Sequence, residues 1–232
     1  MRCSRIGTAA AIVGSLVFIG YVVSTLDLDR LREHLTPRAF GAMAVAVLLY
    51  AWLVPASALA WQWILAALGH RERWFPLAAI LATTQAGKYL PGNVGHHVGR
   101  VGFSLRRGMP LPVLVASMAY ELCLVLLAIL FTILGAGIAS GPGLRLLLRA
   151  DDGHVGMVAA LVIAIAGIVA IPLLSRAVQW LTAIVVRRRS GSDSVPPALP
   201  LRTMLAVIAL YVLSMLLVGG SLATLSIGLL PA

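Results

Sequence analysis

The residues of this chain best suited to chemistry are cations gathered in one short stretch. Residues 87–107, GKYLPGNVGHHVGRVGFSLRR, contain Lys88, His97 and Arg100 and lie between two strongly apolar segments. Glu121 is the one acidic residue within the apolar run that follows. An ionisable group inside such a run is costly, so it requires a partner or a function. We expect Glu121 to pair with Arg100 or with Lys88, either as a structural ion pair or as part of a ligand site.

One carboxylate facing several cations, beside a helix start with free amides, is typical of an anion site. The Pro91-Gly92 pair interrupts any helix that arrives from Pro76, and Asn93 is a suitable N-cap for a new helix. Anionic lipid headgroups are the anions most available to a basic pocket between membrane helices. The residues that we predict to bind a lipid or another anion are Lys88, Asn93, His97, Arg100 and Glu121.

At about 100° per residue, the stretch from residue 93 onward divides into three helix faces. The polar face holds Asn93, His97, Arg100, Ser104 and Arg107, the apolar face Val94, Val98, Val101 and Leu105, and the third face Gly95, Gly99 and Gly102. Glycines at this spacing favour tight helix contact within a bilayer. We therefore predict that Pro91, Gly92, Gly95, Gly99 and Gly102 shape a hairpin, while a solvated amphipathic connector is the alternative.

Other site chemistries are not indicated. His96 and His97 point about 100° apart on a helix, and no Cys or carboxylate follows at metal-ligand spacing. Cys3 and Cys123 are too few for a disulfide framework. The sequence has no Ser/His/Asp set, P-loop or dinucleotide fingerprint. It predicts no catalytic residue, no enzyme activity, no cofactor and no metal.

The composition indicates an integral membrane protein. Of 232 residues 60% are hydrophobic and 11% are charged, whereas about a quarter are charged in soluble domains. The formal charge of +10 does not indicate nucleic-acid binding, because the 18 Lys and Arg residues lie in connections between apolar runs. Spanning helices are predicted at about 6–26, 40–68, 109–139, 155–175 and 203–230. A cleaved signal peptide is the alternative for the first. Trp61 and Trp63 are interpreted as interface anchors.

Residues 76–90 are too short and too polar at their far end to cross alone. If residues 76–107 enter and return on the side of the N-terminus, thirteen Lys and Arg residues lie inside and five outside. A single crossing would leave six inside and 12 outside, which the positive-inside rule opposes. We therefore predict an all-α polytopic membrane helix bundle, a single transmembrane domain over residues 1–232. It has about five spanning helices, a re-entrant hairpin at about 76–107, a flexible cytoplasmic linker at 187–202 and a cytoplasmic N-terminus in the plasma membrane.

Three segments together resemble a known family. KYLPGNVGHHVGR, the RRG turn at 106–108 and SMAYELCLVLL at 117–127 are similar to the transmembrane region of lysylphosphatidylglycerol synthases and to stand-alone flippase-like membrane proteins. Those proteins carry a Pro-Gly-x-x-Gly-x-x-x-Arg-like segment followed by a span with Glu near its start. The corresponding positions here are Pro91, Gly92, Gly95, Arg100 and Glu121, with four residues rather than three between Gly95 and Arg100.

The resemblance implies a bundle that binds anionic phospholipid or lipid-linked glycan, and it leaves open whether that lipid is translocated. It also implies a second half of the membrane region, with another Gly-rich re-entrant segment, which would start at about Ala232, and it argues against lipid aminoacylation by this chain because the soluble transferase domain is not in this sequence. The alternative is a non-transporting accessory subunit of a lipid-modifying or glycosyl-transferring membrane enzyme. In that case the face formed by Gly95, Gly99 and Gly102 would contact the partner.

Overall fold

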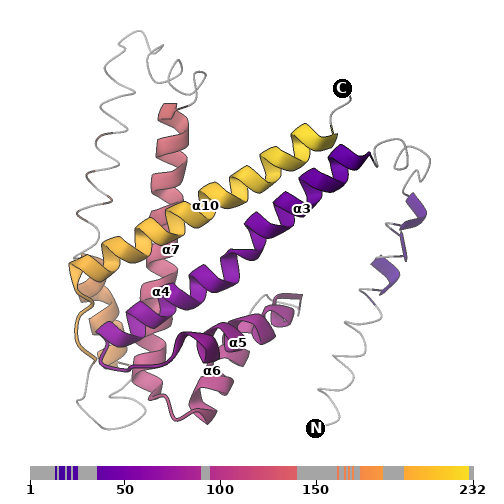
Figure 1. The fold of residues 1–232 in the computed structure, drawn as a ribbon. Coiled ribbons are helices and arrows are strands. Elements are labelled where there is room, and N and C mark those ends of the chain that lie inside the picture. Colours follow the sequence, from indigo (N-terminus) through magenta and orange to yellow (C-terminus); the bar gives the residue numbers. More distant parts are fainter. Residues whose placement is uncertain are drawn as a thin grey trace.

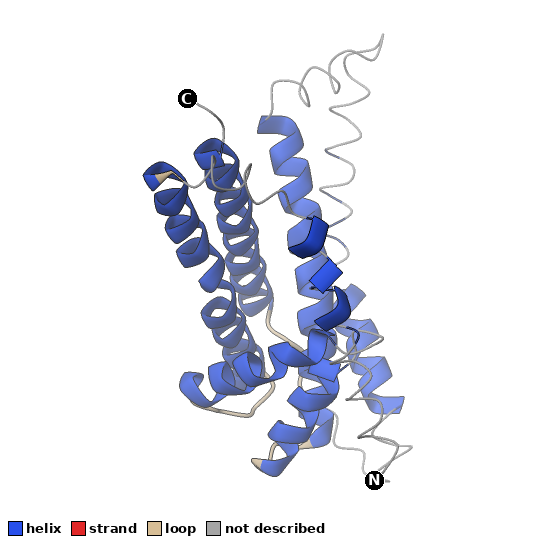
Figure 2. Ribbon diagram, turned by 90° about the vertical axis from the view of Figure 1, so that its right-hand side faces the viewer, coloured by secondary structure: helices blue, strands red, loops and turns tan. Residues whose placement is uncertain are grey.

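The computed structural model describes residues 14, 16–18, 20–21, 23–25, 36–89, 95–139, 161, 165, 167, 169, 173–184 and 196–229. All regular secondary structure in these residues is helical (Figures 1 and 2), which confirms the predicted all-α class. Most of the predicted spans at 6–26 and 155–175 lies outside the described residues. Within the described part, residues 173–184 form a helix, so this helix continues beyond the predicted end at residue 175.

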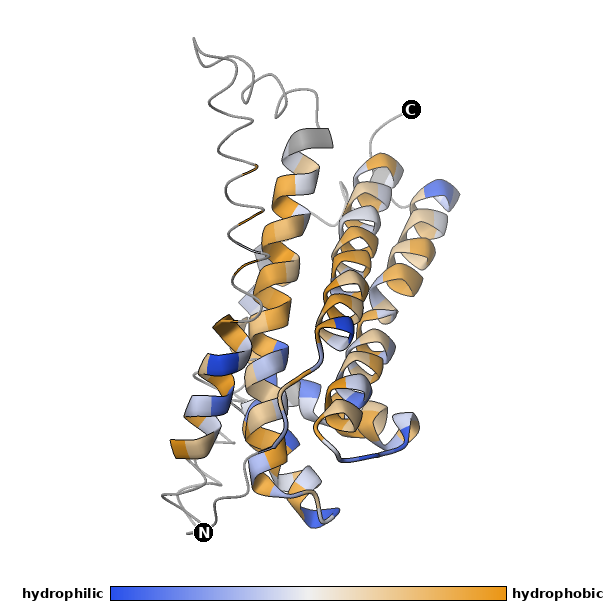
Figure 3. Cartoon of the chain, turned by 90° about the vertical axis from the view of Figure 1, so that its left-hand side faces the viewer, coloured by the Kyte–Doolittle hydropathy of each residue, from blue (hydrophilic) through white to orange (hydrophobic). Residues whose placement is uncertain are grey.

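Three long helical segments dominate the described structure. They are α3 (Pro37–Ala51) continued by α4 (Leu53–Ala67), α7 (Leu111–Ala139) and α10 (Leu201–Leu229). Their apolar stretches contain 31, 27 and 28 residues, and about 20 suffice to cross a bilayer. Hydrophobic residues line the long helices in Figure 3. These helices coincide with the predicted spans at 40–68, 109–139 and 203–230, and the chain is a multi-pass membrane protein.

The break between α3 and α4 has a local cause. Pro55 lacks an amide hydrogen and therefore cannot donate to the carbonyl four residues earlier, which interrupts the helix near Trp52. The indole of Trp74 donates to the Pro55 carbonyl at 3.2 Å. At its other end, α3 begins with Pro37 and is capped by Thr36, whose hydroxyl accepts from the Ala39 amide. The bend thus follows from one proline within an otherwise continuous span.

Two clusters of buried apolar side chains hold the bundle together. The larger one joins α4, α7 and α10 and includes Ile64, Leu124 and Val207. The second joins α4, α7 and α5 (Trp74–Thr84) through Trp61, Leu77 and Leu114. At the far end of α10, Gly228 lies against the Ala42 methyl group, so α3 and α10 approach closely there.

A helical hairpin is inserted between α4 and α7. It consists of α5, the short 3-10 helix η1 (Gln85–Tyr89) and α6 (Gly95–Arg106). Its two ends meet: Arg107 Nη2 lies 2.7 Å from Glu72 Oε1, and the Gln62 amide donates to the Glu72 carbonyl at 3.0 Å. Gly69 and Gly108 provide the left-handed turns beside this contact, at φ 85° and 80°.

The chain therefore leaves α4, runs out along the hairpin and returns to the same end of the bundle before α7 begins (Figure 1). Re-entry of residues 76–107 into the membrane from one side stays a prediction. The expected tip, including Pro91, Gly92 and Asn93, lies outside the described residues.

The glycines of the hairpin differ in what surrounds them. A Cβ on Gly87 would lie 2.6 Å from the His96 amide nitrogen, and one on Gly99 would lie 3.0 Å from Thr84 Cγ2. A Cβ on Gly102 would meet nothing within 4 Å. The close-packing role expected of the glycine face is thus found at Gly99 and, in addition, at Gly87, but Gly102 faces open space.

The end of the predicted linker at 187–202 packs against the helix bundle. In residues 196–200, the described part of the linker, Leu199 is buried and its amide lies 3.4 Å from the Tyr120 hydroxyl. Prolines at 196, 197 and 200 restrict this backbone further. Leu199 thus holds the end of the linker against the core, while residues 187–195, for which flexibility is predicted, lie outside the described residues.

The contact at Gly87 gives a test of the hairpin. We expect Gly87→Ala to destabilise the protein by about 2 kcal/mol or more, because the added methyl group would overlap backbone atoms that cannot easily move. Gly102→Ala, in the same hairpin but facing open space, should be neutral or stabilising by up to ~1 kcal/mol. Unfolding in detergent, followed by circular dichroism, measures both. Equal stabilities of the two variants would contradict this packing.

Candidate functional site

Helix α6 turns its polar face inward. Its buried residues are Arg100 and Ser104, whereas Val98 is 66% exposed and Phe103 and Leu105 are also exposed. A helix at the surface of a water-soluble protein has the opposite arrangement, with its apolar stripe inward. Exposed apolar side chains around a polar interior suit a helix with lipid outside, and they argue against a solvated connector.

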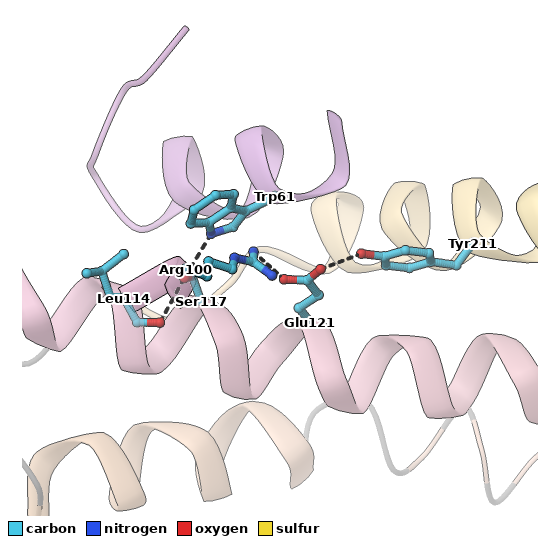
Figure 4. A network of polar contacts seen from close by, with 6 residues as sticks. All are labelled: Trp61, Arg100, Leu114, Ser117, Glu121 and Tyr211. Atoms are coloured by element: carbon cyan, nitrogen blue, oxygen red, sulfur yellow. Dashed lines mark hydrogen bonds and ion pairs between the residues drawn. The ribbon is translucent and has the colours of Figure 1, made fainter. Parts of the chain in front are cut away.

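The inward face of α6 forms an ion pair with α7. Arg100 Nη2 lies 2.5 Å from Glu121 Oε2, and the two side chains are only 6% and 14% exposed. The predicted partner of Glu121 is therefore Arg100 rather than Lys88. The other carboxylate oxygen, Oε1, accepts a hydrogen bond from the Tyr211 hydroxyl of α10 at 3.0 Å (Figure 4). The Glu121 carboxylate thus connects α6, α7 and α10.

Trp61 of α4 completes this arrangement. The Arg100 guanidinium carbon lies 3.6 Å from the centre of the Trp61 ring, a distance typical of a strong cation–π contact. The indole nitrogen donates to Ser117 Oγ at 3.1 Å, and Ser117 in turn donates to the Leu114 carbonyl (Figure 4). These hydrogen bonds fix the indole on which the guanidinium rests.

The sequence interpretation missed both aromatic residues. Trp61 was expected at the membrane interface, but it is fully buried under Arg100. Tyr211 was not singled out at all. The available signal was an aromatic residue with a polar group inside an apolar span, in a chain with one buried carboxylate to satisfy. That signal does not say which aromatic residue reaches the site.

The ion pair lies well inside the bundle. Glu121 follows the start of α7 by ten residues, and Tyr211 follows the start of α10 by ten residues. At 1.5 Å per residue, both lie ~15 Å along their helices, about half the thickness of a hydrocarbon core. At that depth protein groups replace water around the pair, with Trp61 against the guanidinium and Tyr211 bonded to the carboxylate.

A polar pocket of about 280 Å³ opens beside the pair. Its lining residues come from α4, α5, η1, α6 and α7: Ser57, Leu81, Gln85, Lys88, His96, His97, Arg100, Met118, Glu121, Leu122 and Val125. The structure thus brings together four of the five predicted binding residues, Lys88, His97, Arg100 and Glu121; the fifth, Asn93, lies outside the described residues.

The charges lining the pocket favour an anion. Lys88 and Arg100 are cationic, and Glu121 is the one carboxylate among the described residues that line the pocket. The His96 and His97 rings lie 3.8 Å apart. Among the described residues, no three His, Cys, Asp or Glu side chains gather as metal ligands would.

The family model for the lysylphosphatidylglycerol synthase TM region matches residues 8–230. The chain belongs to this family. The match extends far beyond the roughly forty residues that carry the recognisable motifs, and it includes every helix that contributes to the pocket. Comparisons with curated proteins and with solved structures found no match.

The buried pair makes a quantitative prediction. We expect Glu121→Gln to reduce the free energy of unfolding by about 3–5 kcal/mol, because it leaves the Arg100 guanidinium buried without a counter-charge. The Arg100→Gln/Glu121→Gln double variant should lose less than the sum of the two single variants. Chemical denaturation in detergent measures all three.

Glu72→Gln is the matched control, since it removes one partner of the more exposed Arg107–Glu72 pair. Its effect should remain within ~1 kcal/mol. If Glu121→Gln were no more destabilising than Glu72→Gln, the pair would not be buried as described.

Proposed function

We propose that this protein binds the headgroup of an anionic or glycosylated lipid in the polar pocket, as a flippase-like member of its family. The observation that carries the proposal is the Arg100–Glu121 pair, which lies beside an open polar pocket at the depth of the bilayer interior. Replacing a buried ion pair by apolar residues is often neutral or stabilising. Stability alone is therefore a weak reason for such a pair, and a role in binding a ligand also accounts for it.

The proposed anion site contains hydrogen-bond donors that a ligand could use. Lys88 is exposed and lines the pocket. Arg100 Nε is buried and has no hydrogen-bond partner in the described part of the chain. A buried donor of this kind is usually satisfied by water or a ligand. A lipid phosphate held by Lys88 and Arg100 would satisfy it, while Glu121 and Trp61 would keep the guanidinium in place.

The size of the pocket is consistent with a headgroup alone. Sites for small molecules have volumes of about 300–1,000 Å³, and about 280 Å³ lies just below that range. Leu122 and Val125 form part of the wall, and Leu122 is 58% exposed on the outside of α7. In the proposed complex the acyl chains therefore remain in the bilayer, against α7.

The end of the bundle that carries the hairpin base is proposed to face the cytoplasm. Five described arginines lie there, in the loop after α4, at the end of α6 and at the start of α10: Arg71, Arg73, Arg106, Arg107 and Arg202. Arg38 lies at the opposite end, in the first turn of α3. The positive-inside rule favours this orientation, which would open the hairpin and its pocket to the inner leaflet and place the N-terminus on the same side.

Lipid binding is tested by removing the accessible cation of the pocket. We expect Lys88→Gln to weaken retention of phosphatidylglycerol about fivefold, the effect of the ~1 kcal/mol that one cation contributes near anionic lipid. Arg106→Gln is the control, because Arg106 is an exposed cation of the same hairpin that does not line the pocket. Native mass spectrometry of the purified protein, titrated with phosphatidylglycerol and phosphatidylcholine, provides the measurement.

Equal losses in Lys88→Gln and Arg106→Gln would show only general attraction to charged lipid and would refute the pocket. Translocation is a separate part of the proposal. Its test is the transbilayer movement of a labelled anionic lipid in vesicles containing the protein, where we expect Lys88→Gln to slow the movement relative to Arg106→Gln.

A further inference from the structure

A second cavity lies between the end of α4 and the start of α10. Its volume is about 580 Å³, roughly twice that of the polar pocket. The residues that line this α4–α10 cavity are Trp63, Ala66, Ala67, Pro200, Arg202, Thr203 and Ala206. None of them lines the polar pocket, so the two sites are independent. Figure 1 shows the two helix ends side by side.

The wall of the α4–α10 cavity combines two kinds of surface. Three alanines provide the space, since larger side chains at these positions would fill it. Trp63 and the alanines are apolar, whereas Arg202 and Thr203 supply a guanidinium and a hydroxyl. Among the described residues that line the cavity there is no carboxylate beside the Arg202 guanidinium. A ligand that suits this wall has an anionic group attached to an apolar body.

The position of the cavity identifies the source of such a ligand. Arg202 is the second residue of α10, and Ala67 is the last residue of α4, so the cavity lies where these spans end. The headgroup region of a bilayer meets the protein at that level, and Trp and Arg are typical there. Basic pockets between membrane helices suit anionic headgroups. Free phosphate would use the arginine but not the apolar wall.

We propose that the α4–α10 cavity is a second lipid site, which holds the phosphate of an anionic phospholipid. Arg202 and the Thr203 hydroxyl bind the phosphate, and Trp63 and Ala206 contact the glycerol and the first methylene groups. The site does not depend on the polar pocket or on transport. Its assignment to the inner leaflet follows from the orientation proposed above, but the binding chemistry does not.

The experiment uses the full chain in nanodiscs of phosphatidylcholine with a minor fraction of photoactivatable phosphatidylglycerol. After irradiation, mass spectrometry of peptides locates the label. We expect labelled peptides from residues 63–67 and 200–206. Arg202→Gln should reduce this labelling about fivefold. Ala206→Trp, at an exposed position of the wall, should also reduce it by filling the cavity while leaving Arg202 in place.

Two matched controls accompany these variants. Arg71→Gln removes an exposed arginine at the same end of the bundle, and Ala223→Trp adds an indole at an exposed position near the other end of α10. Neither should change labelling of the cavity. Unfolding midpoints identify any variant that fails to fold, and the remaining variant then decides.

Three results would overturn the proposal: equal labelling by photoactivatable phosphatidylcholine, unchanged labelling in both Arg202→Gln and Ala206→Trp, or an equal loss in the controls. Lys88→Gln distinguishes the two sites, since it should affect the polar pocket and leave the α4–α10 cavity labelled.

Discussion

The arrangement of the site depends on one interaction, the ion pair between Arg100 and Glu121 inside an apolar bundle. Each charge alone would be expensive at this depth, so each constrains where the other can lie. Because Arg100 belongs to the hairpin and Glu121 to a long apolar helix, the pair determines how far the hairpin reaches along α7. The contacts of Trp61 with the Arg100 guanidinium and of Tyr211 with the Glu121 carboxylate then restrict the positions of these two groups further.

The same interaction explains why α6 has polar side chains toward the protein and apolar side chains on the outside. Arg100 and Ser104 face the protein, and Val98, Phe103 and Leu105 face outward. In water this orientation would expose apolar surface and bury a charge, and both changes are unfavourable. In lipid the outward apolar side chains would have an apolar environment, and the inward Arg100 charge is neutralised by Glu121. At the base of the hairpin, a different ion pair joins its two ends, Arg107 with Glu72. This pair is more exposed and contributes less to stability.

Cations occur in two settings with different consequences. Arg100 is neutralised, covered and held in place, so it can present a defined donor to a ligand. Lys88 and Arg202 differ, because among the described residues that line their cavities the one carboxylate is Glu121, which is already paired with Arg100. They retain the long-range attraction for anions that a paired charge loses.

Much of the fold was determined by the sequence alone. Uninterrupted apolar runs of span length at 40–68, 109–139 and 203–230 leave few alternatives to helices, because backbone polar groups in lipid must be satisfied within the segment. One buried carboxylate among cations also limited its predicted partner to Arg100 or Lys88, of which the structure selects Arg100. These features are local or additive along the chain, and can therefore be read without coordinates.

Only the tertiary structure decided which aromatic side chains surround the pair, which glycines make close contacts and where the second cavity lies. Trp61 and Trp63 are two residues apart, yet one lies buried under Arg100 and the other lines the α4–α10 cavity. Gly99 packs against Thr84, while Gly102 faces open space. Helix periodicity defines the faces of each helix, but the rotation and tilt of the helices against one another select the face that meets a neighbour. That selection depends on contacts between residues far apart in the chain.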